Sequence, residues 1–524
     1  MRRPLLISGF MATGKSSVGK RVAELSGRRF VDLDREIERK GGASVAELFS
    51  GLGESGFRAL ERSALFEALD ATGSAPVIAL GGGALVSREV RLAAVDRAVV
   101  VTLTAELGEI LDRARAESGT RPLLAGDPAA RAAALLELRQ TAYSEAHARL
   151  ATDGRSVQEI AQQALGVWQR DPIAVAAGDR SYAVDIGEAL VAERLPAAVG
   201  KASKRVLISD ETVYGLHGAP VRDSLADPAV VVLSPGEQHK HIGSVEKIWR
   251  AAQAAEVDRK ACFVALGGGV VSDIAGFAAA TYQRGVRWVG VPTTLLAMVD
   301  ASVGGKTGVD LESAKNAVGA FHQPSAVLCD VTLLSTESDR GFRSALAEVV
   351  KTALIGDPEL FELLERETER VLARSNQVLA ELVRRSIRVK ARIVSADERE
   401  SGLRAVLNLG HTVGHALESQ GGYSRLSHGE AVSLGLVAAL RIGVALAATP
   451  RELAERSERL LAKLGLPADI AREPLADAVG LIGHDKKRAG KSIKFVVAQG
   501  LGDVVTRDIE LGELSRHTLA LAGS

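Results

Sequence analysis

The first stretch whose residues could perform chemistry is Gly9-Phe-Met-Ala-Thr-Gly-Lys15-Ser16, which fits the pattern GxxxxGK[ST]. It follows the apolar run LLIS directly and precedes a helix-forming segment, which is the context that this phosphate-binding motif requires. Glycines let backbone N–H groups turn toward a phosphate chain, Lys15 can reach the β and γ oxygens, and Ser16 can hold Mg²⁺. We therefore predict an ATP site. The residues expected to contact the nucleotide are Ala12, Thr13, Gly14, Lys15, Ser16 and Ser17.

Two carboxylates follow at Asp32 and Asp34, in the segment FVDLD at the end of an expected strand. Side chains alternate along a strand, so both would lie on one side, where they could serve a metal ion and hydroxyl groups. Arg58 follows on a helix-like segment, and Arg121 and Arg139 come later. Taken singly, the acids could be a solvated strand end or a helix cap, and each arginine could be an ordinary surface charge.

The pentapeptide ALGGG occurs twice, at residues 79–83 and 265–269. The residues that follow the two copies differ, which favours two separate sites over an internal repeat. The second copy leads into GGGVVSD, a strand-to-helix turn suited to a pyrophosphate. Ser272 stands where the pattern GxGxxG would place its last glycine, so a plain tight turn remains the alternative. The segment SVGGKTG lacks the first glycine of a phosphate-binding loop, and we therefore predict one ATP site rather than two.

A third group of chemically competent residues lies in the C-terminal part. Glu348 and Lys351 are three apart in RSALAEVVKTALIG, where apolar residues surround them on nearly every face and predict a buried helix. An internal Glu–Lys pair and a metal ligand both agree with that burial. His411 and His415 share one helical face, and His428 opens the next helix. One carboxylate with two imidazoles is a recurring catalytic zinc set, although spacing alone would select His411 with His415.

The elements that must position these residues belong to an α/β protein of several domains. The 524 residues exceed what one hydrophobic core usually serves. Short apolar runs alternate with helices up to about residue 167, and a second strand-rich series begins after WQRDP, whereas helices dominate after about Asp330. We predict a parallel-sheet P-loop domain at 1–170, an α/β Rossmann-like domain at 174–330, and a mostly α-helical domain at 331–524.

The charge, the cysteines and the hydropathy limit which binding partners and which cellular compartment are expected. Lys plus Arg number 65 and Asp plus Glu also number 65, so no net field favours nucleic acid or an anionic membrane, and small molecules are the expected partners. Cys262 and Cys329 lie in apolar runs and are predicted to be buried free thiols in a reducing compartment. The longest apolar segment, 431–449, contains Arg441 and predicts a buried helix rather than a membrane span. We expect a cytoplasmic location.

The first 165 or so residues resemble the shikimate kinase family, because the P-loop, DLD, FRxxE, LGGG, RPLL and RxxxYxE segments occur in family order. The resemblance implies ATP- and Mg²⁺-dependent phosphorylation of shikimate. It implies that Lys15, Asp34 and Arg121 are catalytic, with Arg121 closing over the transferring phosphate, and that Asp32 and Ser16 support Mg²⁺. Shikimate would be held by Asp34, Arg58, Gly82 and Arg139. Ala12 stands where the family usually has glycine, which would crowd the loop slightly without removing an N–H donor.

The chain from about Ile173 onward resembles 3-dehydroquinate synthase, through PGEQHK, the second ALGGG and the segments from YQRG to VLCD. The resemblance implies a bound NAD⁺ that is catalytic and not consumed. The implied NAD⁺ contacts are Asp210, Glu237, Lys240, Gly269, Val270, Val271, Ser272, Asp273, Thr293, Thr294, Lys306, Lys315 and Thr332. Ser272, Met298 and Ala301 depart from the residues that are usual in the family.

The same resemblance implies a Zn²⁺ or Co²⁺ ion on Glu348, His411 and His428, with His415 left near the substrate. The implied substrate is 3-deoxy-arabino-heptulosonate 7-phosphate, which is oxidised, loses phosphate, is reduced again and closes to 3-dehydroquinate. The implied catalytic residues are Lys306, Lys351, Arg404 and His415. The implied substrate contacts are Arg284, Asp300, Asn316, Lys351, Lys390, Glu400, Arg404, Asn408, His415 and Lys486. Many cations suit a substrate with a carboxylate and a phosphate.

The leading hypothesis is thus a fused bifunctional enzyme of aromatic amino acid biosynthesis, and a homodimer through the synthase half is implied by resemblance only. A second hypothesis keeps both folds but joins another small-metabolite kinase to a different sugar-phosphate cyclase or a metal-dependent alcohol dehydrogenase. A third is a nucleotide-binding sensor without catalysis. Asp34, Arg58 and Arg139 argue against the second, and the retained Lys15 and Glu348 argue against the third.

Overall fold

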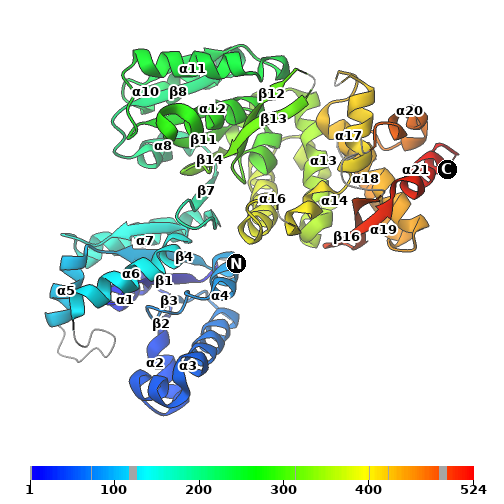
Figure 1. The fold of residues 1–524 in the computed structure, drawn as a ribbon. Helices are drawn as coiled ribbons and strands as arrows, with labels where there is room; N and C mark the ends of the chain where they lie inside the picture. The colour runs from blue at the N-terminus through cyan, green and yellow to red at the C-terminus, as the bar shows by residue number, and fades with distance from the viewer. Residues whose placement is uncertain are drawn as a thin grey trace. The chain divides into compact units, whose positions relative to one another are not determined.

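The computed structural model describes residues 3–71, 73–116, 127–312, 314–400, 402–422, 424–482 and 492–523. The predicted site residues Arg121 and Lys486 lie outside the described residues. The chain divides into two compact units, Met1–Asp185 and Ile186–Ser524 (Figure 1). Each unit is built around its own parallel sheet, which confirms the predicted α/β class.

The first unit contains a five-stranded parallel sheet of order β2-β3-β1-β4-β5. Its strands are β1 Leu5–Gly9, β2 Phe30–Asp32, β3 Val77–Ala79, β4 Val99–Thr104 and β5 Ala148–Ala151. Its helices are α1 Lys15–Ser26, α2 Leu33–Gly41, α3 Val45–Asp70, α4 Arg88–Arg97, α5 Leu107–Ala116, α6 Pro128–Ser144 and α7 Val157–Arg170. The antiparallel pair β6 Ile173–Val175 and β7 Tyr182–Gly187 follows at the end of this unit.

Alternation along β1 explains why helices cover both faces of this sheet. Leu5 and Ile7 belong to a core cluster with residues of α1 and α7, whereas Leu6 belongs to a second cluster with residues of α3 and α4. All five residues of β1 are buried, which is typical of a central strand in a parallel sheet. The phosphate-binding motif therefore begins at the carboxyl end of the most protected strand.

The second unit begins with an α/β part whose strands have the order β14-β11-β10-β8-β9 and are all parallel. These strands are β8 Arg205–Asp210, β9 Ala229–Leu233, β10 Cys262–Gly267, β11 Arg287–Pro292 and β14 Ala326–Asp330. The surrounding helices are α8 Val191–Val199, α9 Glu211–Val213, α10 Ala219–Ser224, α11 Ile242–Ala254 and α12 Gly269–Thr281. Short helical turns are η2 Tyr214–Gly218, η3 Glu237–His239, η4 Tyr282–Arg284, η5 Ala297–Ala301 and η6 Val331–Thr336.

A hairpin and a helical part complete the second unit (green to red in Figure 1). The hairpin consists of β12 Lys306–Leu311 and β13 Ala314–Phe321, which are antiparallel. The helices are α13 Asp339–Gly356, α14 Pro358–Arg366, α15 Thr368–Leu372, α16 Asn376–Ala396, α17 His411–Gln420, α18 His428–Ala445, α19 Arg451–Lys463, α20 Leu475–Val479 and α21 Leu511–Ala520. Shorter turns are η7 Leu403–Asn408, η8 Ile470–Arg472 and η10 Leu521–Gly523. The predicted helical character is confirmed, but a further antiparallel hairpin, β15 Ser492–Gly500 with β16 Asp503–Glu510, was not predicted.

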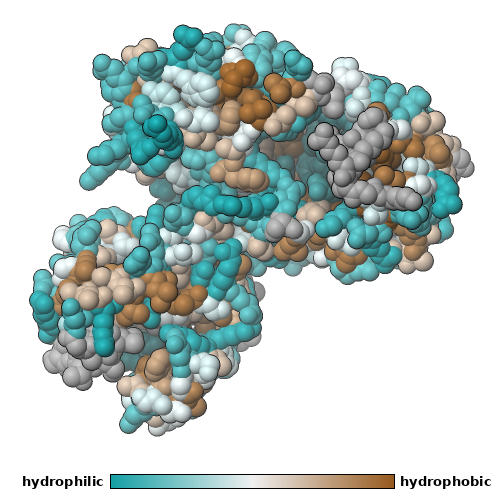
Figure 2. All heavy atoms as spheres, in the orientation of Figure 1, coloured by the Kyte–Doolittle hydropathy of each residue, from teal (hydrophilic) through white to brown (hydrophobic). Residues whose placement is uncertain are grey.

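One described helix, α18, is long and apolar enough to cross a membrane, and 72% of that window is buried inside the protein. Such burial agrees with the predicted core helix. On the face drawn in Figure 2, apolar residues form separate patches among hydrophilic ones. Cys262 and Cys329 are both buried and free, as predicted, and burial raises the pKa of the Cys262 thiol to about 11.

The predicted domain limits near residues 170, 174 and 330 stay predictions; the compact first unit runs to Asp185. Ala174 packs in the core of this unit, and the Gly178 N–H donates to Glu145. One strand end differs from the sequence-based expectation. The strand that was expected to carry both Asp32 and Asp34 ends at Asp32, and Asp34 lies in the first turn of α2.

Candidate active sites

The loop between β1 and α1 has the backbone shape that a phosphate cradle needs. Gly9 has φ +139° and Gly14 has φ +86°, values that L side chains rarely adopt. A Cβ on Gly9 would also lie 2.9 Å from Thr13 Oγ1. Ala12 has φ +59°, in the left-handed region. This conformation costs a residue with a side chain about 1–2 kcal/mol of backbone strain, and the slight crowding expected from the sequence stays a prediction.

The polar side chains of this loop face inward. Lys15 Nζ donates to the carbonyl oxygen of Phe10 at 2.8 Å, and Thr13 Oγ1 donates to the same oxygen at 2.8 Å. Ser16 Oγ donates to Asp32 Oδ2 at 2.8 Å. Asp32 and Ser16 thus lie next to each other at the start of α1, which is the arrangement that could support a magnesium ion.

Three charged residues converge on the first GGG segment. A Cβ on Gly81 would lie 2.7 Å from Asp34 Oδ1 and 2.8 Å from Glu61 Oε1, so both carboxylates lie against the glycine. Arg58 forms an ion pair with Glu61 at 2.6 Å, and a Cβ on Gly83 would overlap with the Arg58 guanidinium. Burial, followed by the charge of Asp32, raises the pKa of Asp34, and Lys15 opposes the rise. The carboxylate of Asp34 is therefore more basic than an exposed one.

Gly82, the middle glycine of that segment, accepts hydrogen bonds from helix α6. Arg139 Nη1 donates to the carbonyl oxygen of Gly82 at 3.1 Å, and the Tyr143 hydroxyl donates to it at 2.7 Å. The ALGGG segment thus carries residues that contact α3, the start of α2, and α6. Gly81 and Gly83 are needed because a Cβ at either position would occupy the space of these charged groups, whereas a Cβ on Gly82 would lie 3.6 Å from Arg139 Nη1, an ordinary contact.

The second GGG segment forms the turn between β10 and α12, as predicted. Gly269 begins α12, and a Cβ on Gly268 would lie 3.3 Å from Thr294 Cγ2. The hydroxyls of Ser272 and Thr293 are buried without a hydrogen-bond partner among the described residues. Buried hydroxyls normally have partners, so these two are open to a ligand at the N-terminus of α12. Neither orphaned hydroxyl could be inferred from the sequence motif.

A buried ion pair lies beside this turn. Lys240 Nζ contacts Asp273 Oδ2 at 2.6 Å and Asn316 Oδ1 at 2.5 Å. Burial raises the pKa of Asp273 to about 6, although Lys240 acts in the opposite direction. Asn316, which was predicted to contact the substrate, therefore contacts Lys240. Lys240 and its partner Asp273 were both predicted to contact NAD⁺.

Glu337 provides a pH-dependent contact to the same region. Its Oε2 accepts the Leu295 N–H at 2.9 Å, directly after Thr293 and Thr294. Burial raises the pKa of Glu337 from 4.5 to about 7, although Leu295 and Arg374 oppose the rise. Since the folded-state pKa exceeds the unfolded one, the stability that this group contributes is complete below the unfolded pKa and is lost as the pH rises through about 7.

We expect Glu337→Gln to raise the free energy of unfolding by about 1–3 kcal/mol near pH 8.5, because the amide has no charge to bury. The gain should shrink as the pH is lowered toward about 5.5. Urea unfolding of both proteins at the two pH values measures it, with the exposed Glu362→Gln as the control. A gain that is independent of pH would contradict this account.

Glu348, His411 and His428 form a cluster in the helical part. His411 Nε2 and His428 Nε2 lie 3.5 Å and 3.3 Å from the same oxygen, Glu348 Oε1. One ligand atom from each of the three lies within 4.8 Å of the others, close enough to share one metal ion. Glu348 is 1% exposed, and Lys351 Nζ lies 2.5 Å from its Oε2. The lysine pair considered for Glu348 is therefore present, and the role of Glu348 as a metal ligand, which this arrangement also allows, stays a prediction.

Close helix packing brings these three residues together. His411 opens α17, His428 opens α18, and Glu348 lies in the middle of α13. Glycine permits the approach, because a Cβ on Gly429 would overlap with the carbonyl oxygen of Ser344 on α13. Ser427 and Glu430 form a capping box that fixes the first turn of α18 beside His428.

The charges of the cluster favour cation binding. Burial would raise the pKa of Glu348, but Lys351, His428 and His411 outweigh it and hold the pKa well below its usual range. Burial, and next the charge of Lys351, lowers the pKa of His411 to about 3, so its ring is neutral at neutral pH. Burial disfavours protonation of His428, yet the neighbouring carboxylates of Glu348 and Glu418 raise its pKa to about 10. A metal ion would take the place of that proton.

His415, the alternative partner from spacing, also lies near the cluster. Its ring centroid is 4.9 Å from that of His411 and 6.0 Å from that of His428. Burial lowers the pKa of His415. A second group of possible ligands comprises His415, Glu418 and His428.

Other predicted residues form pairs around the cluster. Lys390 Nζ contacts Asp300 Oδ1 at 2.5 Å, and Lys306 forms an ion pair with Glu400. Arg404 is buried and donates to the carbonyl oxygen of Glu398 at 2.8 Å. Acids or carbonyl oxygens hold these cationic side chains, which are therefore oriented before a substrate binds.

Several predicted residues do not contact the cluster of Glu348, His411 and His428 directly. Among the described residues, no hydrogen bond or ion pair joins this cluster to any of the following: Asp210, Glu237, Arg284, Thr332 and Asn408. Asp210 caps α9, and Thr332 donates to Asp330. Their predicted roles stay predictions.

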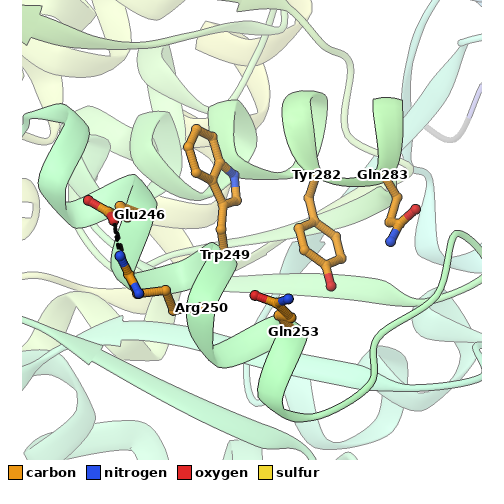
Figure 3. A pocket seen from close by; sticks show the side chains of 6 residues that line it. All are labelled: Glu246, Trp249, Arg250, Gln253, Tyr282 and Gln283. Carbon is orange, nitrogen blue, oxygen red and sulfur yellow. Dashed lines mark hydrogen bonds and ion pairs between the residues drawn. The ribbon is translucent and has the colours of Figure 1, made fainter.

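A separate surface pocket is lined by residues of α11 and η4 (Figure 3): Glu246, Trp249, Arg250, Gln253, Tyr282 and Gln283. Its only drawn contact is the Glu246–Arg250 pair, at 2.6 Å. The exposed Arg284 is next in sequence to Gln283. None of the predicted site residues lines this pocket, and it is not a candidate for the chemistry.

The sequence-based list of site residues missed Glu418 and Tyr143. Glu418 accepts from Lys315 Nζ at 3.0 Å and lies 3.4 Å from His428 Nδ1. It is seven residues beyond His411 on the same helix, a spacing of two turns that could have selected it. Tyr143 entered only as part of the RxxxYxE pattern.

Comparisons with known protein families cover most of both units. The model for shikimate kinase matches residues 11–169. The models for the 3-dehydroquinate synthase N-terminal and C-terminal parts match residues 230–344 and 345–488. The three matched ranges contain the phosphate loop from Met11 onward, the second GGG turn and the histidine cluster described above.

Individual relatives agree with these matches. The chain is 44% identical over 328 residues to "3-dehydroquinate synthase" of Halorhodospira halophila (strain DSM 244 / SL1), covering 63% of this chain and 93% of that protein. A solved structure of ValA, a 2-epi-5-epi-valiolone synthase from Streptomyces hygroscopicus subsp. jinggangensis 5008 with NAD⁺ and Zn²⁺ bound, is 29% identical with a TM-score of 0.60, covering 65% of this chain and 97% of that one. A 2-deoxy-scyllo-inosose synthase complexed with carbaglucose-6-phosphate, NAD⁺ and Co²⁺ shares the fold, at 24% identity and a TM-score of 0.61, covering 66% and 99% of the two chains.

Proposed function

The chain belongs to the 3-dehydroquinate synthase family and carries a shikimate kinase domain before it, and from this we propose how the residues of one bifunctional enzyme perform its two reactions. The observation that supports the assignment most is that each unit brings together a group of its predicted site residues. Lys15 and Asp34 lie at the first, and Glu348, His411 and His428 at the second.

In the kinase unit, the loop amides and Lys15 bind the phosphates of ATP, and Ser16 with Asp32 holds Mg²⁺. ATP with Mg²⁺ supplies the phosphoryl group and the charge that stabilises its transfer. Arg58 and Arg139 bind the carboxylate of shikimate, and Asp34 accepts the proton of the attacking hydroxyl. The raised pKa of Asp34 supports this role, because a more basic carboxylate is a better acceptor.

Gly83→Ala tests the proposed shikimate pocket. The added Cβ would overlap with Arg58, so the guanidinium must leave its present position beside Glu61. We expect the KM for shikimate to rise about tenfold or more, since a charged hydrogen bond contributes about 1.5–3 kcal/mol, while the KM for ATP stays unchanged. Steady-state kinetics measure both constants. Gly108→Ala is the control, because its Cβ would have nothing within 4 Å, and an equal effect in both variants would contradict the proposal.

In the synthase unit, the donor set fits a divalent transition metal. Both carboxylate oxygens of Glu348 are buried without a hydrogen-bond partner among the described residues, although Lys351 neutralises the charge. Two imidazole nitrogens face one of these oxygens. Two histidines and one carboxylate are a set that Zn²⁺ accepts with a coordination position left open. We propose that Glu348, His411 and His428 hold Zn²⁺ or Co²⁺.

The turn at the start of α12 fits NAD⁺ by a similar argument. Glycines give a pyrophosphate close access to the helix N-terminus, and the orphaned Ser272 and Thr293 hydroxyls offer hydrogen bonds. Bound at this turn, NAD⁺ would supply a hydride acceptor and donor, and a metal held by Glu348, His411 and His428 would supply a Lewis acid. Lys240 and Asp273 fix the side chains around this turn.

The remaining cations bind the acidic groups of 3-deoxy-arabino-heptulosonate 7-phosphate. Lys351, Lys390 and Arg404 are buried and can bind a carboxylate or a phosphate with little water in competition. His415 lies beside the metal ligands and can move a proton near the substrate. Lys306 and the exposed Arg284 are the less enclosed cations of this set.

Chelation and reconstitution test this assignment. Protein dialysed against a chelator should lose release of phosphate from 3-deoxy-arabino-heptulosonate 7-phosphate, and Zn²⁺ or Co²⁺ with NAD⁺ should restore it. Shikimate phosphorylation in added Mg²⁺ should be the same before and after dialysis. Phosphate release that persists in fully metal-free protein would overturn the assignment of the metal.

We further propose a homodimer through the synthase half and a cytoplasmic location. The resemblance supports the dimer, and the two buried free thiols support a reducing compartment. The proposed partners are shikimate, ATP and the heptulosonate phosphate, which are small molecules. Equal numbers of acidic and basic residues support the absence of nucleic acid and membrane partners.

A further inference from the structure

We propose that Glu418 is a positioning residue that orients His428 for the metal, and that Lys315 in turn holds Glu418. This inference rests on the proposed metal function of Glu348, His411 and His428. His428 Nδ1 lies 3.4 Å from Glu418 Oε2, and Glu418 Oε1 accepts from Lys315 Nζ at 3.0 Å. The chain of contacts therefore runs from a lysine of β13 through a carboxylate of α17 to the first residue of α18.

The two ring nitrogens of His428 have different partners on its two sides. Nε2 lies 3.3 Å from Glu348 Oε1, whereas Nδ1 faces Glu418. His411 has the same pattern, because its Nε2 faces Glu348 and its Nδ1 lies 3.1 Å from the carbonyl oxygen of Leu409. An acceptor at Nδ1 keeps the proton there and leaves the Nε2 lone pair free for a metal. Each ligating ring thus has its own acceptor for the outer nitrogen.

Glu418 could instead be a direct ligand in the second group, with His415 and His428. That group uses the same histidine, and one imidazole cannot present both nitrogens to a single ion. Each acid pairs with a lysine, Glu348 with Lys351 and Glu418 with Lys315. Glu348 is the more buried of the two, 1% exposed against 7%, and the Nε2 atoms of both His411 and His428 face one of its oxygens. The geometry favours Glu348 as ligand and Glu418 as the outer acceptor.

The contact between Lys315 and Glu418 has a second consequence. It lies on the β12–β13 hairpin, which contacts α12 of the α/β part, while Glu418 and His428 belong to the adjacent helices α17 and α18 (Figure 1). Lys315 was predicted to contact NAD⁺. The Lys315–Glu418 pair therefore connects the proposed nicotinamide side of the site to a metal ligand through two side chains.

The test measures Co²⁺ binding by the full-length metal-free protein without substrate, by calorimetry and by the visible absorption of the bound ion. We expect Glu418→Gln to weaken Co²⁺ binding about 10- to 100-fold, which is typical for loss of an outer carboxylate, with the ligand-field bands shifted but retained. Lys315→Met should weaken it less, because the carboxylate itself remains. Glu430→Gln is the matched control: it lies two residues from His428 and caps the same helix, and its Co²⁺ affinity should be unchanged.

The outcomes separate this inference from the proposed function. Failure of the wild-type protein to bind Co²⁺ would overturn the metal assignment and this inference together. Wild-type binding with an unchanged affinity in Glu418→Gln would overturn only the role of Glu418. Equal losses in Glu418→Gln and Glu430→Gln, with equally lowered unfolding temperatures, would show a general packing effect and would also overturn it.

Discussion

Replacement of Glu348 by alanine is expected to lower 3-dehydroquinate formation at least about 10³-fold and to leave shikimate phosphorylation unchanged. The metal loses its carboxylate ligand, and polarisation of the reacting hydroxyl by a metal contributes several kcal/mol to the transition state. Lys351 would lose the partner that now lies 2.5 Å away, so the buried site would also become more positive and repel a cation.

The variant is compared with Glu348→Gln, which keeps the volume of the side chain, and with Glu365→Ala, which breaks the half-buried pair with Arg456. Zinc content, unfolding temperature and both activities are measured on each. The glutamine variant should also lose the synthase reaction, whereas Glu365→Ala should retain both. Substantial synthase activity in Glu348→Gln at wild-type metal content would contradict the role of Glu348 as ligand.

Lys15→Ala is expected to produce the reciprocal result, with a loss of shikimate phosphorylation of about 10²- to 10³-fold and unchanged synthase activity. Lys15 is the cation of the loop that can follow the charge on the transferring phosphoryl group, and removal of one such donor has an effect of this size. In the structure its Nζ donates to the carbonyl oxygen of Phe10, inside the loop, and is therefore oriented before ATP arrives.

Lys20→Ala is the matched control, because Lys20 lies on the exposed face of the same helix α1 and has no place in the loop. Kinase kinetics at saturating ATP and shikimate separate a loss in kcat from weaker binding. A fall in synthase activity in Lys15→Ala would show that the two sites are coupled. A kinase rate equal to that of Lys20→Ala would remove Lys15 from the proposed mechanism.

The local motifs were predictable from sequence because their chemistry and their backbone shape are encoded in neighbouring residues. The phosphate loop lies between a buried strand and a helix as GxxxxGK[ST] requires, and the second GGG segment opens α12. The sensor and altered-substrate hypotheses are set aside by the family matches to shikimate kinase and 3-dehydroquinate synthase. The fold class followed from the same alternation of apolar runs and helices.

Features that depend on tertiary packing were harder to predict from the sequence. Spacing favoured His411 with His415, whereas the structure brings His411 and His428 to Glu348 through close contacts of α13, α17 and α18. Glu418 was missed because its partners come from a distant hairpin and another helix. Asp34 was placed on a strand, but a helix begins one residue earlier, since Asp32 caps it.

Domain limits depend on contacts that no local motif encodes. The turn WQRDP predicts a boundary near residue 170, which stays a prediction, and the compact first unit extends to Asp185. Arg3 binds Asp171 and the carbonyl oxygen of Pro172, and Glu145 accepts the Gly178 N–H, so the segment after α7 is part of the first unit. Composition marks where an element ends, whereas these long-range contacts decide to which core the following residues belong.

The most direct test of two separate sites in one polypeptide is to measure both reactions on single preparations of the wild-type, Lys15→Ala and Glu348→Ala proteins. Shikimate 3-phosphate formation and phosphate release from 3-deoxy-arabino-heptulosonate 7-phosphate are followed in parallel. We predict that the wild type performs both reactions and that each variant loses only the reaction of its own unit. Loss of both reactions in either variant, or a wild-type protein that lacks one of them, would contradict the account.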